Sequence, residues 1–213
     1  MRLTVCVLLL TLVVARPASA QLCSGNPSFQ SGPYQVGVAA SFTEGARGVE
    51  GTIAAGGDTL FAGAGVSVVK FTDVNVRAAG ITGFVGGEFA TDTRNKALLC
   101  PIVSVAFVAG PDVGPADVSS AGVQAGARIG FIASEDRDTM IVPFFGLAAL
   151  YQHVSTTIAG AEFSASDTGG IADLGVGFIL NKNVGVTPML SIPFSAGSSD
   201  VIFTLRFSFN FGR

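Results

Sequence analysis

Nucleophilic catalysis by a hydroxyl group needs a base beside it, and one short segment of this chain offers both residue types. His153 is the only histidine among the 213 residues, and it precedes Ser155 by two positions. Residues two apart in a strand point to the same face, so the imidazole could activate the Ser155 hydroxyl. His153 and Ser155 are therefore weak candidate catalytic residues. The alternative interpretation is a solvated loop histidine in a protein that is not an enzyme.

A second set of residues carries charge at the polar positions of alternating segments. Its members are Glu50, Glu88, Arg128, Asp173 and Arg206. Charges enclosed by protein must be paired or hydrated, because an unpaired buried charge costs several kcal/mol. We therefore predict a charge network inside the fold. It is either a charged constriction that selects permeating solutes or a set of salt bridges that fills a closed lumen.

Other kinds of site are not expected from this sequence. The chain has no cysteine–histidine cluster with metal-ligand spacing, so we expect no metal and no cofactor. The glycines around Gly63–Gly65 and Gly83–Gly87 are followed by no phosphate-loop lysine. A net charge of −3 and the absence of a basic patch in the sequence argue against a nucleic-acid partner.

The N-terminus has the pattern of a secretory signal peptide. Arg2 supplies the positive charge, Val5–Val14 is apolar apart from one threonine, and Ala18-Ser19-Ala20 is a small-x-small cleavage site. We predict a signal peptide over residues 1–20 and a mature chain that starts at Gln21. The protein is then exported.

Export determines how the cysteines are interpreted. Cys6 lies in the predicted signal peptide, which leaves Cys23 and Cys100 in the mature chain. Two cysteines in an oxidising compartment predict one disulfide, which would contribute roughly 2–4 kcal/mol by closing a long loop. The alternative is a pair of reduced thiols.

Composition and pattern together decide the fold class. Only 13% of residues are charged, against roughly 25% in soluble domains, and mean hydropathy is +0.58. Nevertheless, the mature chain holds no run of about 18 apolar residues such as a spanning helix needs, and its many glycines disfavour helices. Strands remain, and a sheet in lipid must close on itself to leave no unpaired edge. We predict an all-β fold, a closed antiparallel transmembrane β-barrel.

About ten segments alternate between apolar and polar residues with a period of two, and eight or twelve strands remain alternatives. The segments are Tyr34–Thr43, Gly48–Ala55, Thr59–Phe71, Ala79–Ala90, Ala97–Ala109, Val118–Ala133, Met140–Ser155, Gly170–Leu180, Val184–Phe194 and Val201–Phe211. Thr156–Thr168 is predicted to be a long loop. The last segment places phenylalanines on one face and Arg206 on the other, and we expect it to pair with the first.

The strand count fixes the expected organisation. Residues 21–33 form a periplasmic lead-in, and residues 34–213 form the barrel domain. With an even number of strands both termini lie in the periplasm, where the short turns gather, and the longer loops after the fifth, seventh and ninth strands face outside. Cys23 and Cys100 then both lie toward the periplasmic end.

Particular motifs carry a family resemblance. The segment C-P-x-x-S-V at Cys100–Val105 and the closing F-x-F-x-F at Phe207–Phe211, together with the glycine-laced strands, resemble small bacterial outer-membrane β-barrel proteins of the OmpA/OmpW-like porin superfamily. The resemblance implies location in the outer membrane, contact with its lipid and insertion by the barrel-assembly machinery. It also implies a structural or small-pore role, with passage of small solutes.

Two other functions stay open from the sequence. The pair His153 and Ser155 resembles the nucleophile arrangement of outer-membrane lipid A deacylases and phospholipases, although Thr156 stands where an asparagine usually follows. This resemblance implies a lipid hydrolase. The second alternative is an exported soluble β-barrel that binds an apolar ligand, and it predicts that the apolar side chains point inward.

Overall fold

The computed structural model describes residues 22–29, 31–57, 59–72, 76–92, 97–110, 116–136, 138–158, 161–194 and 200–212. Nearly all of them lie in β-strands. No helix in this described part of the chain is long and apolar enough to cross a membrane. The predicted signal peptide and its cleavage site lie outside the described residues.

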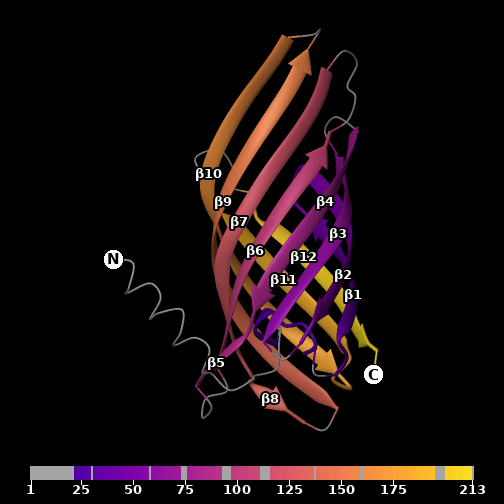
Figure 1. Ribbon diagram of the computed structural model, residues 1–213, viewed down its shortest axis with the longest axis vertical. Coiled ribbons are helices and arrows are strands. Elements are labelled where there is room, and N and C mark those ends of the chain that lie inside the picture. Colours follow the sequence, from indigo (N-terminus) through magenta and orange to yellow (C-terminus); the bar gives the residue numbers. More distant parts are fainter. Residues whose placement is uncertain are drawn as a thin grey trace, which may run out of the picture.

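Ten antiparallel strands form a closed barrel (Figure 1). They are β1 (Tyr34–Phe42), β2 (Ala46–Gly56), β3 (Leu60–Phe71), β4 (Val76–Gly87), β6 (Ala97–Ala109), β7 (Ala116–Phe131), β9 (Thr139–Ile158), β10 (Ala161–Leu180), β11 (Val184–Pro193) and β12 (Ile202–Phe211). Each strand pairs with its neighbours in the chain, β12 pairs with β1, and β10 pairs with both β9 and β11. The predicted fold class, the strand count of ten and the pairing of the last strand with the first are confirmed.

Three short elements lie at the end of the barrel where β1 begins and β12 ends, which is the bottom of Figure 1 and is called the lower end below. β5 (Phe89–Asp92) pairs with β6, and β8 (Ser134–Glu135) pairs with β9. The predicted strand Ala79–Ala90 is therefore interrupted at Glu88, between β4 and β5. The third element is a 3₁₀ turn, η2 (Leu22–Ser24).

The period-two pattern sorts side chains between the outside and the inside of the barrel. On β12, Phe207 is 51% exposed on the outer surface whereas the neighbouring Ser208 is 5% exposed and points inward. Large exposed apolar side chains occur on every one of the ten barrel strands. The soluble-barrel alternative required the opposite arrangement, with apolar side chains inside, so the structure contradicts it.

The hairpin of β9 and β10 corrects one expectation. Thr156–Thr168 was predicted as a loop, but its described residues are strand, because β9 and β10 stay paired up to Ile158 and Ala161. The β-branched residues at the end of β9 favour extended structure, and a strand that stands in water can be polar on both faces. β9 and β10 are 20 residues long each and extend past most of the barrel at its upper end, where β7 stays paired with β9 up to Ile158 (Figure 1).

Residues 22–29, called the plug below, lie inside the lower end of the barrel. Its side chains Leu22, Asn26, Pro27 and Phe29 are buried. Inward side chains of the wall bind its backbone: the Thr187 hydroxyl donates to the Gly25 carbonyl at 2.7 Å, and the amides of Gln35 and Asn210 donate to the Pro27 carbonyl at 3.3 and 3.4 Å. The segment expected as a lead-in thus fills the lower end of the lumen.

Glycines of the inner wall make room for the plug. A Cβ atom on Gly185 would lie 2.7 Å from the Pro27 ring, and one on Gly56 would lie 2.6 Å from the Phe29 ring. Gly25 adopts a φ of +73°, and its Cβ position is 2.8 Å from the Cα atom of Gly177 on β10. Any side chain at these wall positions would overlap the plug.

A single added methyl group should therefore dislodge the plug. We expect Gly177→Ala to lower the free energy of unfolding by about 1–3 kcal/mol, because overpacking forces the backbone apart. Equilibrium urea unfolding in detergent micelles measures this change.

Gly51→Ala is the matched control, since this β2 glycine has no atom within 4 Å of its Cβ position. The control should be as stable as the wild type or slightly more so. Equal stability of the two variants would contradict the packing described for the plug.

Candidate functional site

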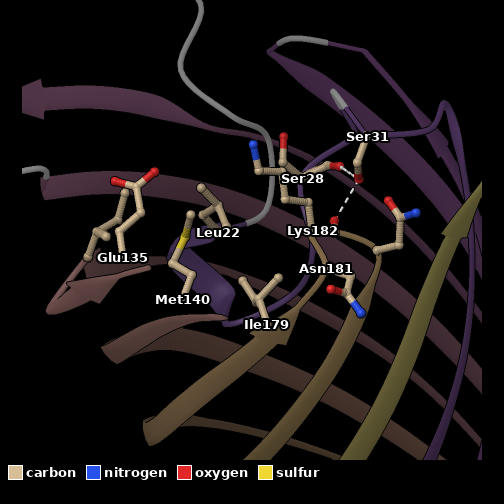
Figure 2. Close-up of a pocket in the computed structure, with 10 residues that line it drawn as sticks. Leu22, Ser28, Ser31, Glu135, Met140, Ile179, Asn181 and Lys182 are labelled. Atoms are coloured by element: carbon tan, nitrogen blue, oxygen red, sulfur yellow. Dashed lines mark hydrogen bonds between the residues drawn. The ribbon is translucent and has the colours of Figure 1, made fainter. Parts of the chain in front are cut away.

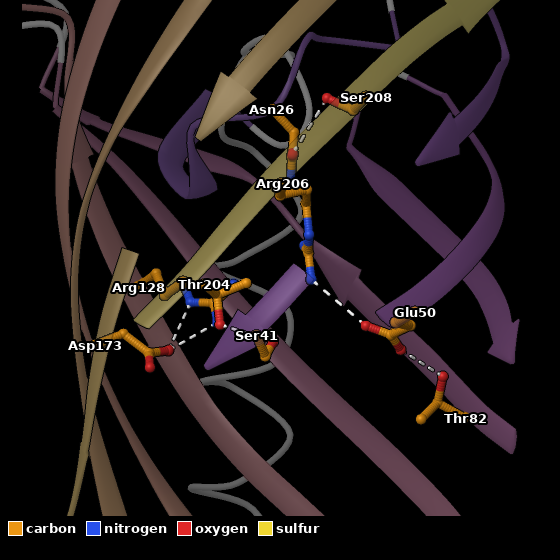
Figure 3. A network of polar contacts seen from close by, with 9 residues as sticks. All are labelled: Asn26, Ser41, Glu50, Thr82, Arg128, Asp173, Thr204, Arg206 and Ser208. Carbon is orange, nitrogen blue, oxygen red and sulfur yellow. Dashed lines mark hydrogen bonds and ion pairs between the residues drawn. The ribbon is translucent and has the colours of Figure 1, made fainter. Parts of the chain in front are cut away.

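A polar cavity of about 270 Å³ lies in the lumen next to the plug and is lined by charged side chains of opposite walls. Glu50, Arg128 and Arg206 all face it, together with the polar side chains of Thr82 and Gln124. Figure 3 shows how these groups converge from β2, β4, β7, β10 and β12. Four of the five charged residues predicted for a lumenal network are thus brought together, as two ion pairs.

The first ion pair joins Arg128 to Asp173. The Nη2 and Nε atoms of Arg128 lie 2.7 and 3.1 Å from Oδ2 of Asp173, and the Ser191 hydroxyl donates to the other oxygen, Oδ1, at 2.6 Å. The two side chains are 16% and 5% exposed, and the guanidinium carbon lies 5.9 Å from the centre of the Phe144 ring. Because both carboxylate oxygens are hydrogen-bonded and the pair is nearly dry, this pair serves the structure of the wall.

The second ion pair is looser. Nη2 of Arg206 lies 4.0 Å from Oε2 of Glu50, and the two side chains are 31% and 27% exposed. The Thr82 hydroxyl donates to the other oxygen of Glu50 at 3.0 Å. A long pair in contact with a wet cavity gains little energy from its own attraction. A solute in the lumen would therefore meet Arg206 and Glu50 as its most exposed charged groups, with Arg128 lining the same cavity.

Both ion pairs bridge across an intervening strand at a small residue. Ala39 on β1 lies opposite Glu50 on one side and Arg206 on the other. Gly146 on β9 lies in the same way between Arg128 and Asp173, and a Cβ atom there would lie 2.7 Å from Cγ of Arg128. A large inward side chain at either middle position would separate the charges.

Glu88, the fifth residue of the predicted network, is not among the residues that line this cavity. It follows β4 at the lower end, is 1% exposed, and has one carboxylate oxygen 3.7 Å from the sulfur of Cys100. Cys100 lies directly opposite Arg128 on β7, so Glu88 stays a predicted member of the network.

The cysteine prediction is only partly covered by the described residues. Cys100 on β6 is fully buried, in an apolar cluster with Leu22, Leu98, Val142 and Ile179. The side chain of Cys23 lies outside what the structure describes. Since Leu22 belongs to the same cluster as Cys100, the backbone next to Cys23 is held beside β6.

A second cavity of about 410 Å³ lies at the lower end between the plug and the rim of the barrel (Figure 2). Leu22, Met140 and Ile179 form its apolar side. On its polar side, the Ser31 hydroxyl oxygen lies 2.8 Å from the Ser28 carbonyl oxygen and 2.7 Å from the Lys182 carbonyl oxygen, and its single proton can be donated to either. These contacts tie the end of the plug to the turn between β10 and β11.

The two candidate catalytic residues have different hydrogen-bond partners. Nδ1 of His153 lies 2.8 Å from the hydroxyl of Ser166 on β10, while the Ser155 hydroxyl donates to Oε1 of Glu162 at 3.0 Å. Tyr151 also donates to Ser166, at 3.2 Å. Ser166 and Glu162 were not predicted as site residues, because they fall in Thr156–Thr168, the segment that the sequence predicts to be a loop. The described residues hold no group of three or more His, Cys, Asp or Glu side chains that could bind a metal ion.

Comparisons with known proteins add a likeness of fold. No protein-family model matches the chain, and no curated protein matches its sequence. Among solved structures, Ail, the attachment invasion locus protein of Yersinia pestis, is 14% identical with a TM-score of 0.45 over 82% of this chain and 93% of that chain. The N-terminal β-barrel domain of Pseudomonas aeruginosa OprF is 11% identical with a TM-score of 0.40 over 84% and 96%. The KdgM porin in complex with disordered oligogalacturonate is 9% identical with a TM-score of 0.42 over 83% and 99%.

These three neighbours are bacterial outer-membrane β-barrels.

The two ion pairs should differ in their effect on stability. Arg128→Ala leaves Asp173 buried without its cation, which should lower the free energy of unfolding by about 3–5 kcal/mol. Glu50→Gln, the matched change in the exposed pair, should cost no more than about 1 kcal/mol. Urea unfolding of both variants in detergent measures the difference, and equal losses would contradict the division of roles between the pairs.

Proposed function

We propose that the chain is an integral outer-membrane β-barrel whose lumen is closed at one end by its own N-terminal segment. The observation that carries the proposal is the belt of exposed apolar side chains on all ten strands around a lumen that holds ion pairs. In water the exposed apolar side chains of this belt would be unfavourably solvated. In a membrane the belt would contact lipid while the polar side chains face the lumen, so both faces of the wall would have a favourable environment.

The ends of the barrel differ in a way that supports an orientation. The lower end holds β1's start, β12's end and the plug, and the three-residue turn 181–183 between β10 and β11 lies there. The upper end carries the β9–β10 hairpin that projects beyond the wall (Figure 1). We assign the lower end to the periplasm and the hairpin to the cell exterior, in line with the usual asymmetry of such barrels.

The lumen supports a plugged pore or a scaffold rather than a permanently open channel. The plug packs against inward-facing glycines at the periplasmic end. The Arg128–Asp173 ion pair joins β7 to β10 across β9. Small solutes would pass only when the plug leaves, and they would then meet the wet pair of Arg206 and Glu50.

A disulfide between Cys23 and Cys100 would hold the plug in place. Its support is the buried cluster that contains both Cys100 and Leu22, the residue before Cys23. A covalent bond from η2 to β6 would limit how far the plug could move from the lumen. Export of the chain through a signal peptide cleaved after Ala20 would supply the oxidising compartment.

The partners in this proposal are outer-membrane lipid and the barrel-assembly machinery, which would act on the closing strand β12. We propose no catalytic role for His153 and Ser155. The proton of the Ser155 hydroxyl is directed to Glu162 and the His153 ring to Ser166, so the base is not placed to activate that nucleophile.

Integration in a membrane is tested by extraction and gel migration. We expect the protein to stay in the outer-membrane fraction after alkaline extraction, to need detergent for solubility, and to migrate differently before and after boiling, since a closed barrel resists unfolding by cold detergent. A protein that remains in solution without detergent would contradict the proposal.

The plug is tested by conductance in planar bilayers. Deletion of residues 24–29 should give open-channel steps where the wild type is mostly closed, because the deleted residues fill the lower lumen. Cys100→Ser and reduced wild type should show intermediate, flickering opening if the disulfide tethers the plug.

Arg206→Ala in the deletion variant should then alter the ion selectivity of the open channel, since it removes a cation from the lumenal cavity. An unchanged, closed record from the deletion variant would show that the plug does not control the lumen.

A further inference from the structure

Three basic residues far apart in the sequence lie in one row across the sheet. Arg47 on β2 is opposite Lys70 on β3, and Lys70 is opposite Arg77 on β4. Neighbouring strands are about 4.8 Å apart, so three cations line up along about 10 Å of the wall. We call Arg47, Lys70 and Arg77 the basic row.

The basic row faces away from the lumen. All three residues are exposed, and they alternate with inward neighbours such as Gly48, Val69 and Ala78. Directly below them on the same outer face come the exposed apolar residues of the lipid-facing belt. These are Val49 on β2, Val68 on β3 and Ala79 on β4. The row therefore marks the upper boundary of the apolar belt.

Among the described residues, the basic row has no ion-pair partner. Like charges directly opposite each other on neighbouring strands are destabilising. On β1 the residue opposite Arg47 is Phe42, which stacks on Phe203 at 6.4 Å. Within the described part of the chain, no carboxylate lies at ion-pair distance from any residue of the row.

The row is also distinct from the other basic residues of the described part. Arg128 and Arg206 point into the lumen, and Lys182 lies in a turn at the lower end. The three remaining basic side chains of the described residues are those of the row. Among the described residues, the outward cations of the barrel strands are thus concentrated on three adjacent strands.

We propose that the basic row binds the phosphate groups of anionic lipid headgroups in the outer leaflet. This inference rests on the proposed function, because it takes the upper end of the apolar belt as the outer surface of the membrane. Arginine and lysine beside a membrane surface are attracted to anionic headgroups. Two guanidinium groups around an ammonium can bind phosphate oxygens through several charge-assisted hydrogen bonds.

The position favours a lipid over other anions. Side chains at the edge of the apolar belt can lay their aliphatic parts along it and raise their charged ends into the headgroup layer. The row follows three adjacent strands on the outer wall, so a headgroup whose acyl chains lie on Val49 and Val68 would carry its phosphate to the row. A lumenal solute would not reach these side chains.

The test compares wild type with the triple variant Arg47→Gln, Lys70→Gln, Arg77→Gln. Lys182→Gln is the matched control, because it removes an exposed cation at the opposite end. Purified protein in zwitterionic detergent is titrated with bisphosphorylated lipid A, and binding is counted by native mass spectrometry. We expect the triple variant to bind about a hundredfold more weakly at low salt, and the control to bind as the wild type does.

The outcomes separate this inference from the proposed function. Equal binding by the triple variant and the wild type would overturn the basic row as a lipid site. So would binding of dephosphorylated lipid A by the wild type as tightly as bisphosphorylated lipid A. Full competition by millimolar inorganic phosphate would also overturn it, because it would indicate a free anion as ligand. Insertion of all three proteins into phosphatidylcholine vesicles is scored separately, and failure there would contradict the membrane barrel itself.

Discussion

Close contact between the N-terminal segment and the glycines of the inner wall is the constraint on which the rest of this structure depends. Residues 22–29 can enter the barrel only because Gly56, Gly177 and Gly185 present no side chain to them. The filled lower end leaves the polar cavity closed on one side. A ten-strand barrel with larger inward residues at these positions would have no room for the plug.

Small residues also make room for the ion pairs in the lumen. Two ion pairs reach across an intervening strand, and each passes over a small residue, Ala39 or Gly146. The pair at Gly146 is short and has both carboxylate oxygens hydrogen-bonded, whereas the pair at Ala39 is longer and more exposed, at 31% and 27%. One pair therefore stabilises the wall, and the other is available to whatever occupies the lumen.

Much of the fold could be predicted from the sequence, because a period of two survives along all ten barrel strands and the closing strand shows it most clearly. The register between neighbouring strands could not be predicted, because alternation shows which face of the sheet a residue lies on but not which residue lies opposite it. Arg47, Lys70 and Arg77 therefore looked scattered, and the sequence showed no basic patch. The charged residues Arg128 and Asp173 were recognised as members of one set, but their direct pairing could not be read from the sequence. Ser166 was overlooked because a polar strand in water resembles a loop.

The central claim is that the N-terminal segment occupies the lower lumen of the folded barrel. Nuclear Overhauser effects between the α-protons of Gly25 and Gly177, in wild-type protein in detergent micelles, test it most directly, because the two backbones are in contact. The account predicts strong cross-peaks between these protons and dispersed chemical shifts for residues 22–29. Random-coil shifts for this segment and no cross-peak to Gly177, in a sample whose barrel strands are folded, would contradict it.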